Sequence, residues 1–183
     1  MARHVAFLRG MNLGGRRITN EELRKAFEDL GLGAVETFRA SGNVVFDGPD
    51  GPDGAGGADP SAMIEAGLAE ALGYDVPVFL RSCGQVAAIA GSEPFGAEAV
   101  EASSGKLQVA LLPEAPGKLV REEALGMATD ADRLAIERAE LFWLPSGGIS
   151  ESDLDLKTLE SELGPWTMRT MGTIEQIAAK HCG

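Results

Sequence analysis

The order of apolar and turn-forming segments constrains the fold most strongly. Apolar runs at residues 4–9, 34–40, 43–46 and 76–81 predict four strands, and helical spacing follows the first and third of them. The order β, α, β, β, α, β is that of a ferredoxin-like fold, with an antiparallel sheet in the spatial order 4-1-3-2. Pro77 cannot donate a ladder hydrogen bond, which agrees with a fourth strand at the sheet edge.

Several helices are marked by the residues at their first turn. Thr19 followed by Glu22 has the spacing of a capping box, and Ser82 followed by Gln85 has it again. Pro60 is typical of a first helical position. We therefore predict helices that begin at these three points.

The second half repeats the same order with little sequence similarity. Thr173 with Gln176 predicts the cap of a final helix. We interpret the chain as α+β, with duplicated ferredoxin-like (βαββαβ) halves whose antiparallel sheets are covered by helices, and with a boundary in residues 91–105. The halves span residues 1–92 and 93–183, with second-half strands at 106–112, 133–137, 140–144 and 166–169 and helices at 116–125 and 156–163.

Residues 47–61 form the segment least suited to a packed structure. They contain five Gly, three Pro and four Asp and no apolar side chain larger than Ala and Pro. Ordering them costs about 15 kcal/mol of backbone entropy with little apolar burial in return. We expect a mobile loop that is an insertion and not a site.

The charge distribution limits the classes of partner. The net charge is −12, yet residues 1–46 hold seven Lys or Arg against five Asp or Glu. An acidic body repels polyanions, so we do not expect a broad nucleic-acid surface, and any anion contact is local to the N-terminal part. A second interpretation also stays open, in which the acidic residues serve only to keep the protein in solution.

Other features place the chain among cytoplasmic proteins. No apolar run approaches the length of a membrane span, and the start of the chain lacks a signal-peptide core. Two cysteines, Cys83 and Cys182, are too few for a zinc set, and nothing suggests an oxidising compartment. Cys83 lies in the first turn of a predicted helix, which favours a thiolate, although a packed thiol is the more ordinary reading.

Two polar motifs meet at one end of the first predicted sheet. The first and third strands are antiparallel neighbours, so the loop after one lies beside the turn before the other. The loop offers a guanidinium, an amide and glycine backbone N–H groups, which together suit an anionic or phosphate-bearing molecule. The candidate ligand residues in these motifs are Arg9, Asn12, Gly14, Gly15, Ser41, Gly42 and Asn43.

Each part also has a structural explanation that stays open. Gly14 and Gly15 lack the spacing of a nucleotide fingerprint and allow a turn by themselves. The Ser41–Asn43 segment is ordinary hairpin chemistry. The convergence of these parts, with an Arg9 that leaves an apolar strand and needs a partner, favours a site.

The same residues resemble a known family. VAFLRGMNLGG, ETFRASGNVVF and the tail LFWLPSGGISESDL with LGPWTMRTMGTIEQIA are similar to the bacterial family of domains of unknown function numbered 1697. The resemblance covers nearly the whole chain and implies two ferredoxin-like halves, with no activity to carry over. It adds Thr167, Arg169 and Thr173 to the candidate ligand residues. Thr170 and Gly172 depart from the family pattern, which usually has asparagines there.

The topology suggests one further hypothesis. Thr167 and Arg169 lie at the end of the second sheet that corresponds to the Arg9 end of the first. If a pseudo-twofold relates the halves, Arg9 and Arg169 clamp one anion.

Three functions remain open at this stage. The first is binding of a small anionic ligand, with enzymatic activity undecided and the cofactor unknown, because no Ser/His/Asp order or metal-spaced set occurs. The second is a structural or protein-interaction module without a ligand. The third, ranked lowest, is single-stranded nucleic-acid binding, for which Phe7 and Phe46 are the candidate stacking aromatics. The oligomeric state is left open.

Overall fold

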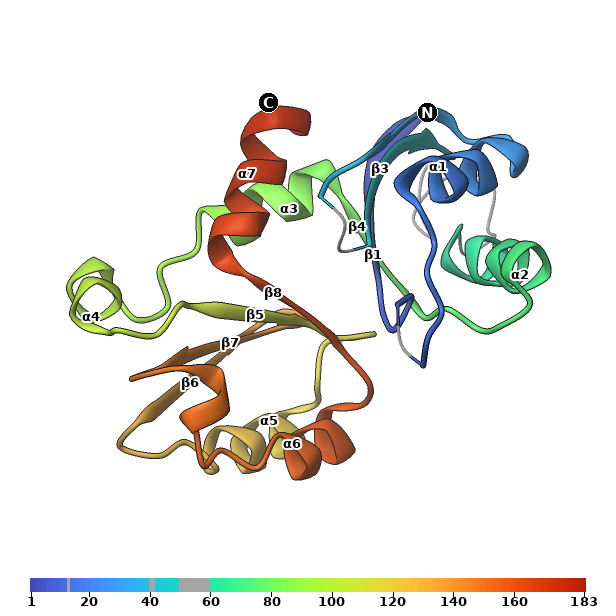
Figure 1. Ribbon diagram of the computed structural model, residues 1–183. Coiled ribbons are helices and arrows are strands. Elements are labelled where there is room, and N and C mark those ends of the chain that lie inside the picture. The colour runs from blue at the N-terminus through green and yellow to red at the C-terminus, as the bar shows by residue number, and fades with distance from the viewer. Residues whose placement is uncertain (13, 40–41, 50–59) are drawn as a thin grey trace. The chain divides into compact units, whose positions relative to one another are not determined.

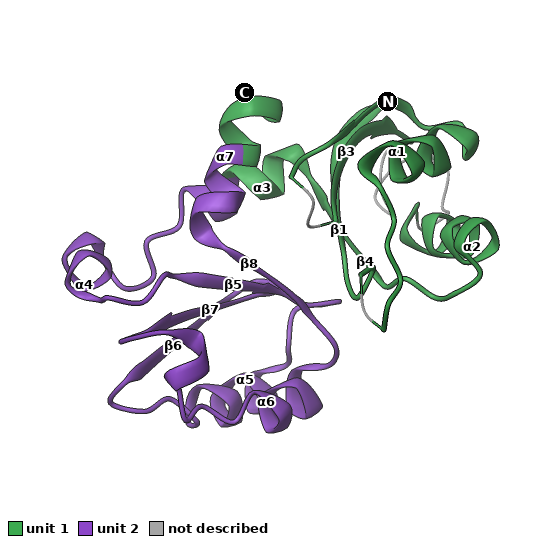
Figure 2. Cartoon of the chain, viewed as in Figure 1, with its two compact units in different colours: residues 1–87, 177–183 green, residues 88–176 purple. Residues whose placement is uncertain are grey.

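The computed structural model describes residues 1–12, 14–39, 42–49 and 60–183, and it divides the chain into two compact units (Figure 1). Unit 1 comprises residues 1–87 and 177–183, and unit 2 comprises residues 88–176 (Figure 2). Each unit contains one four-stranded antiparallel sheet, so the predicted duplication of the α+β architecture is confirmed. The last residues of the chain belong to unit 1, a placement that no sequence pattern indicated.

The sheet of unit 1 has the predicted strand order. Its order β2-β3-β1-β4 is the expected 4-1-3-2 arrangement, with β4 at one edge. Two helices cover one face of this sheet (Figure 1). The elements are β1 (Ala2–Leu8), α1 (Asn20–Asp29), β2 (Gly33–Thr37), β3 (Asn43–Gly48), α2 (Pro60–Leu72) and β4 (Val78–Ser82).

The core of unit 1 lies between the sheet and these two helices. Phe27 of α1 packs against Phe46 of β3 with ring centroids 5.5 Å apart, and both rings are fully buried. Ile64 and Leu68 form the buried stripe of α2 in this core. Residues alternate across β1, so Ala6 and Leu8 face the helices while Val5 and Phe7 face the other way.

The edge strand begins later than its apolar pattern suggests. β4 starts at Val78, after Pro77, whereas the pattern indicated a strand from residue 76. Pro77 has no N–H for the ladder, and its carbonyl oxygen instead accepts from the backbone N–H of Arg9 at 3.0 Å.

Both predicted capping boxes at helix starts in unit 1 are present. Thr19 Oγ1 accepts from the backbone N–H of Glu22, and the Glu22 carboxylate accepts from the backbone N–H of Thr19. Ser82 and Gln85 make the same reciprocal pair, at 2.8 Å and 3.2 Å.

Unit 2 repeats the arrangement with the order β6-β7-β5-β8. Helices α5 and α6 cover one face of its sheet (Figure 1), where Leu141, Trp143 and Leu159 are buried. The elements are β5 (Gln108–Leu111), α5 (Lys118–Leu125), β6 (Asp132–Glu137), β7 (Glu140–Pro145), α6 (Leu156–Leu163) and β8 (Thr167–Thr170).

Two short elements could not be predicted from the sequence. The helix α4 (Ala97–Ala102) buries none of its residues, so it has no apolar stripe that a pattern could reveal. The 3₁₀ helix η1 (Ile149–Glu151) is a single turn.

The chain passes between the units within two helices, α3 (Cys83–Ala90) and α7 (Met171–His181). The prediction that Thr173 caps the last helix is wrong, because α7 begins two residues earlier. Thr170 takes the capping role, and its Oγ1 accepts from the backbone N–H of Thr173 at 3.3 Å.

Cys83 and Cys182 form a disulfide. The expectation of a packed free thiol at Cys83 is therefore wrong, and both cysteines belong to unit 1. Their separation of 99 residues explains why no local pattern pointed to the pair.

The segment predicted as a mobile loop is largely outside the described residues. Of residues 47–61, Asp47 and Gly48 end β3, and Pro60 and Ser61 begin α2. Residues 50–59 lie outside the described part of the chain. Among the described residues, no helix has the length and hydropathy needed to cross a membrane.

Candidate functional site

The structure brings the loop after β1 next to the turn before β3. The backbone N–H of Leu8 donates to the carbonyl oxygen of Gly42 at 2.8 Å, and Phe7 is the register partner of Asn43. The two predicted motifs therefore share one end of the unit 1 sheet. Ser41 lies outside the described residues.

Gly42 is required by this close approach. Its φ is +71°, and a Cβ atom there lies 3.1 Å from Met11 Cε and 3.2 Å from Leu8 Cβ. A side chain here would combine a left-handed backbone with tight contacts to Met11 and Leu8, which favours glycine. The turn is thereby held against the loop that begins at Arg9.

Asn43 serves the turn with its side chain. It is fully buried, and its Nδ2 donates to the carbonyl oxygen of Phe38 at 3.1 Å, while its own carbonyl oxygen accepts from the Phe38 backbone N–H at 2.9 Å. These bonds close the β2–β3 connection from both sides. Asn43 therefore acts by positioning the turn.

The loop from residue 9 to residue 18 presents polar groups to solvent. Asn12 is exposed, and its Oδ1 accepts from the backbone N–H of Ile18 at 3.3 Å, so the Nδ2–H groups are the donors that this side chain offers. Gly14 and Gly15 have φ of +66° and +83° with open space around them. Arg9 is half-buried where β1 ends.

Tyr74 anchors this loop, and sequence reasoning did not identify it. Its hydroxyl donates to the carbonyl oxygen of Met11 at 3.2 Å, and the Arg16 guanidinium lies 4.2 Å from the ring centroid. The Arg16 guanidinium therefore makes a cation–π contact with this ring. In the sequence, the one signal for this anchoring role was a tyrosine directly after Gly73, at the end of α2.

The N-terminus of α1 is occupied by the protein's own carboxylate. Hydrogen bonds from Thr19 hold the pKa of Glu22 below its ordinary value, so this side chain is ionised at the helix end. An external anion gains little from that helix terminus. The predicted donors of this region that are separate from the helix end are Arg9, Asn12 and the glycine N–H groups.

The candidate residues of unit 2 lie on and just after the edge strand β8. Thr167 and Arg169 project to the same face of that strand, and Arg169 Nη1 donates to Thr167 Oγ1 at 2.8 Å. Burial lowers the pKa of Arg169 to about 10. The hydroxyl of Thr173, in α7, lies 3.0 Å from that of Thr170, the last residue of β8.

Thr167 and Arg169 lie on the face of the unit 2 sheet that α5 and α6 do not cover. The unit 1 sheet has a corresponding face that α1 and α2 do not cover. Phe7, Phe79 and Arg81 share one face of the unit 1 sheet and are all buried. In unit 2, Val109 and Arg169 are register partners on the corresponding face. Arg81 was not among the residues that the sequence singled out, although Phe79-Leu80-Arg81 repeats the Phe-Leu-Arg sequence that ends at Arg9.

Each unit also has a surface hollow away from these residues. In unit 1, a hollow of about 520 Å³ contains none of the predicted ligand residues. In unit 2, a hollow of about 500 Å³ lies beside the buried Asp132. Among the described residues, no group of three or more His, Cys, Asp or Glu is arranged to hold a metal ion. The unit 1 hollow is lined by Arg16, Arg17, Ile18, Glu22, Lys25, Ala26, Asp29, Ala71, Leu72 and Tyr74.

Comparison with known proteins gives a family and a structural relative. The family model described as "Protein of unknown function (DUF1697)" matches residues 1–142. The structure is similar to that of the conserved bacterial protein SP0830 from Streptococcus pneumoniae, with 22% identity and a TM-score of 0.74. That similarity covers 98% of this chain and 97% of the other, and it shows the fold. No curated protein matches the chain.

Proposed function

The chain belongs to the DUF1697 family, and from this premise we propose that it binds a small anionic or phosphate-bearing molecule at the end of the unit 1 sheet where β1 stops. The observation that carries the proposal is the Leu8–Gly42 hydrogen bond, which gathers two polar segments at one sheet end. Arg9, Asn12 and the backbone N–H groups of Gly14 and Gly15 are the proposed donors. A guanidinium with nearby amide donors is well suited to a phosphate or carboxylate.

In this proposal the residues of the turn have a different role from those of the loop. Gly42 and Asn43 hold the turn in place through packing and hydrogen bonds, and Ser41 completes the set as a hydroxyl donor. A change at Asn43 therefore weakens binding through the shape of the turn. A change at Arg9 removes the charge itself.

Within unit 2 by itself, we propose Thr167, Arg169 and Thr173 as ligand residues. Burial disfavours the charge of Arg169, as its lowered pKa indicates. An anion next to this guanidinium stabilises the charged form. The proposal concerns binding, and it includes no reaction step and no cofactor.

A ligand screen by thermal shift tests the proposal. The panel contains inorganic phosphate, pyrophosphate, sugar phosphates, nucleotides and small carboxylates. We expect at least one of them to raise the Tm of the wild type by several degrees at about 100 times its Kd, because binding to the folded state alone adds about 2.7 kcal/mol. The Arg9→Ala variant loses this shift.

Arg24→Ala is the matched control for Arg9→Ala. Arg24 lies on α1 and pairs with Glu28 at 2.6 Å on the protein surface, so its loss removes an equal charge at a place remote from the turn. The control retains the ligand-induced shift. A shift that is equally large in the Arg9→Ala variant contradicts the proposed site.

A structural or interaction module without a ligand is the second candidate. The observation that favours it is the burial of Phe7, Val45 and Phe79 on the face that α1 and α2 do not cover, because such a face serves packing by itself. The absence of a Tm shift in the wild type with every ligand of the panel supports this candidate.

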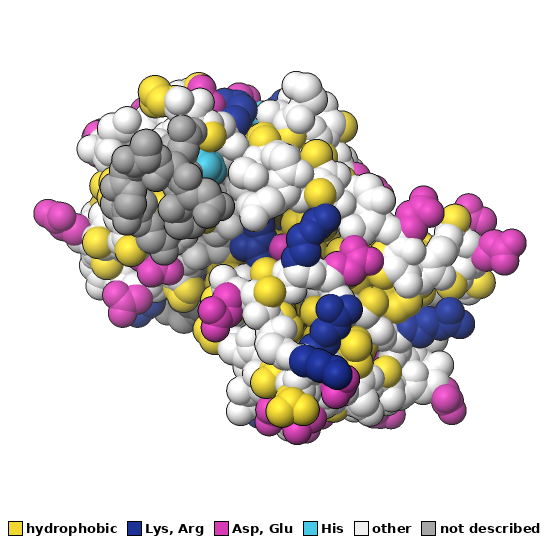
Figure 3. Space-filling view, turned by 180° about the vertical axis from the view of Figure 1, so that it is seen from behind, with side chains coloured by type: hydrophobic (Ala, Val, Ile, Leu, Met, Phe, Trp, Pro, Cys, Tyr) yellow, Lys and Arg dark blue, Asp and Glu magenta, His cyan; other side chains and the backbone are white. Residues whose placement is uncertain are grey.

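Single-stranded nucleic-acid binding needs exposed aromatic side chains for base stacking, and the two candidates are not exposed. Phe7 and Phe46 are both fully buried. On the face drawn in Figure 3, the Lys and Arg side chains stand in small groups with Asp and Glu around them. A filter-binding titration at low salt tests this function, with no retention expected at micromolar protein.

A cytoplasmic location is part of the proposal. Disulfides are rare in that compartment and are usually transient or redox-sensing there. Trapping of free thiols in intact cells, followed by measurement of the Cys83–Cys182 redox state, tests the location together with the state of the bond.

A further inference from the structure

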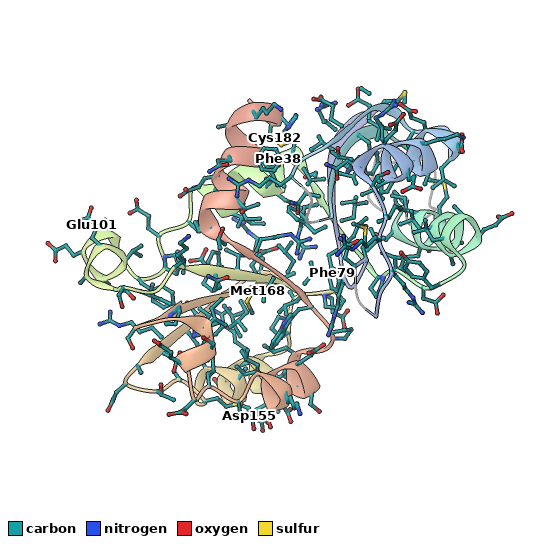
Figure 4. All side chains as sticks on the ribbon, in the orientation of Figure 1. Phe38, Phe79, Glu101, Asp155, Met168 and Cys182 are labelled. Carbon is teal, nitrogen blue, oxygen red and sulfur yellow. A yellow bond between two sulfur atoms is a disulfide. The ribbon has the colours of Figure 1, made fainter. Side chains whose placement is uncertain are left out.

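The two cysteines of the disulfide lie at opposite kinds of helix end, and Cys83 Sγ also lies 3.5 Å from the carbonyl oxygen of His181. Cys83 is the first residue of α3, and Cys182 follows directly after His181, the last residue of α7. Figure 4 shows Cys182 near the end of α7. A helix N-terminus stabilises negative charge and a C-terminus disfavours it, so the thiolate of Cys83 is the more stable of the two.

The N-terminus of α3 is free to act on Cys83 because its cap is neutral. Ser82 and Gln85 form the capping box, and the first turn contains no acidic residue. This differs from α1, where Glu22 places a carboxylate at the same position. No carboxylate of the cap therefore opposes a thiolate at Cys83.

The surroundings of Cys182 give no comparable support. Lys180 lies in the last turn of α7, but its ammonium group is directed at the Phe38 ring, 6.0 Å from the centroid. Both cysteines are half-buried and each is followed by an exposed glycine, Gly84 and Gly183. Neither cysteine is therefore fully enclosed by the described residues.

We propose that the Cys83–Cys182 disulfide is a thiol-exchange site for low-molecular-weight thiols, with Cys182 as the sulfur that is attacked. The incoming thiolate forms a bond to Cys182 Sγ, the bond between the two protein sulfurs breaks, and Cys83 leaves with the electron pair as a thiolate. The product is a mixed disulfide on Cys182. A second thiolate then attacks the added sulfur and releases Cys182 as a thiolate, while the two small thiols leave as their disulfide.

The exchange has a consequence for the end of the chain. Without the covalent bond, the last residues are held to unit 1 by weaker contacts, which include Arg3 Nε with the carbonyl oxygen of His181 at 3.3 Å and His181 Nδ1 with Glu36 at 3.6 Å. We expect faster backbone hydrogen exchange in residues 177–183 of the reduced protein than of the oxidised protein.

Reaction of the oxidised wild type with glutathione, stopped by iodoacetamide, tests the direction of attack. Peptide mapping by mass spectrometry should find glutathione on Cys182 together with an alkylated Cys83. We expect this product to exceed the reverse product about fivefold in the folded protein. In urea, where the helix ends no longer exist, the two products should form in equal amounts.

Three results overturn the proposal. They are equal adducts in the folded protein, an excess of the adduct on Cys83, and exchange that occurs in urea alone. The single variants Cys182→Ser and Cys83→Ser give a second measurement in protein whose fold is checked by circular dichroism. The remaining Cys83 should reach half of its maximal labelling rate at a lower pH than the remaining Cys182, and the opposite order also overturns the proposal.

Discussion

The backbone N–H of Leu8 donates to the carbonyl oxygen of Gly42 at 2.8 Å across the end of the unit 1 sheet. Leu8 ends β1, and Gly42 comes directly before β3, so this bond relates the start of the Arg9 loop to the turn opposite it. A change that moves the turn therefore disturbs both the sheet end and the proposed binding residues.

Gly42→Ala should destabilise the protein by about 2–3 kcal/mol. A left-handed backbone costs alanine about 1 kcal/mol, and the new Cβ also presses on Met11 and Leu8. Urea denaturation measures the loss. Gly73→Ala is the control, because Gly73 has a similar φ of +76° with open space around it, and we expect it to lose only about 1 kcal/mol. Equal losses in the two variants contradict the role of the close contact.

Asp132→Ala should cost about 3 kcal/mol of unfolding free energy. The buried carboxylate accepts from Trp143 Nε1 at 2.8 Å, Ser152 Oγ at 2.7 Å and Thr129 Oγ1 at 3.0 Å, and all three donors lose this partner. Asp132→Asn keeps an acceptor oxygen and should lose less. The exposed neighbour Asp130 serves as the control, where alanine should change the unfolding free energy by at most about 0.5 kcal/mol. A small loss in Asp132→Ala contradicts this account.

Thr19→Ala should cost about 1 kcal/mol through loss of the α1 cap. The backbone N–H of residue 19, the larger cause of the lowered pKa of Glu22, remains in this variant, but the hydrogen bond from the Thr19 hydroxyl is lost, so the pKa of Glu22 should rise part of the way toward its ordinary value. Thermal unfolding gives the stability, and an NMR titration of the Glu22 carboxyl group gives the pKa. Glu21→Gln is the control for charge in the same turn, and it should leave the Glu22 titration nearly unchanged.

His181 should make the protein less stable in weak acid. Burial lowers its pKa below the ordinary value of 6.5, against the opposing effect of Glu36, so the unfolded chain takes up the proton first. The contribution to stability is complete above the unfolded pKa and declines as the pH falls from there to the folded pKa. Unfolding free energies at pH 7.5 and 5.5 should differ more in the wild type than in His181→Gln. An equal or smaller difference in the wild type contradicts the prediction.

Local signals were sufficient for much of the fold. Thr19 with Glu22 and Ser82 with Gln85 identify helix starts because a capping box depends on residues only three apart. The apolar runs predict both sheets because strand order follows from a known arrangement of six elements. The start of α7 was misjudged, since Thr170 and Thr173 are both suitable caps and only the end of β8 decides between them.

The distant relationships had no local signal. Cys83 and Cys182 are paired by the position of the chain end, which depends on the complete fold. The placement of Arg9 near Gly42 could be predicted, since it follows from neighbouring antiparallel strands. The contact of Arg16 with Tyr74 could not, because it depends on how a loop lies against the residues after α2.

The return of residues 177–183 to unit 1 makes that unit discontinuous along the chain. Arg3, near the beginning, bonds to the carbonyl oxygen of His181, near the end. During synthesis, the sheet of unit 1 leaves the ribosome early, but its final packing and its disulfide must wait until residues 177–183 have been translated. Unit 2 is therefore synthesised before the last segment of unit 1, as an insertion within that unit.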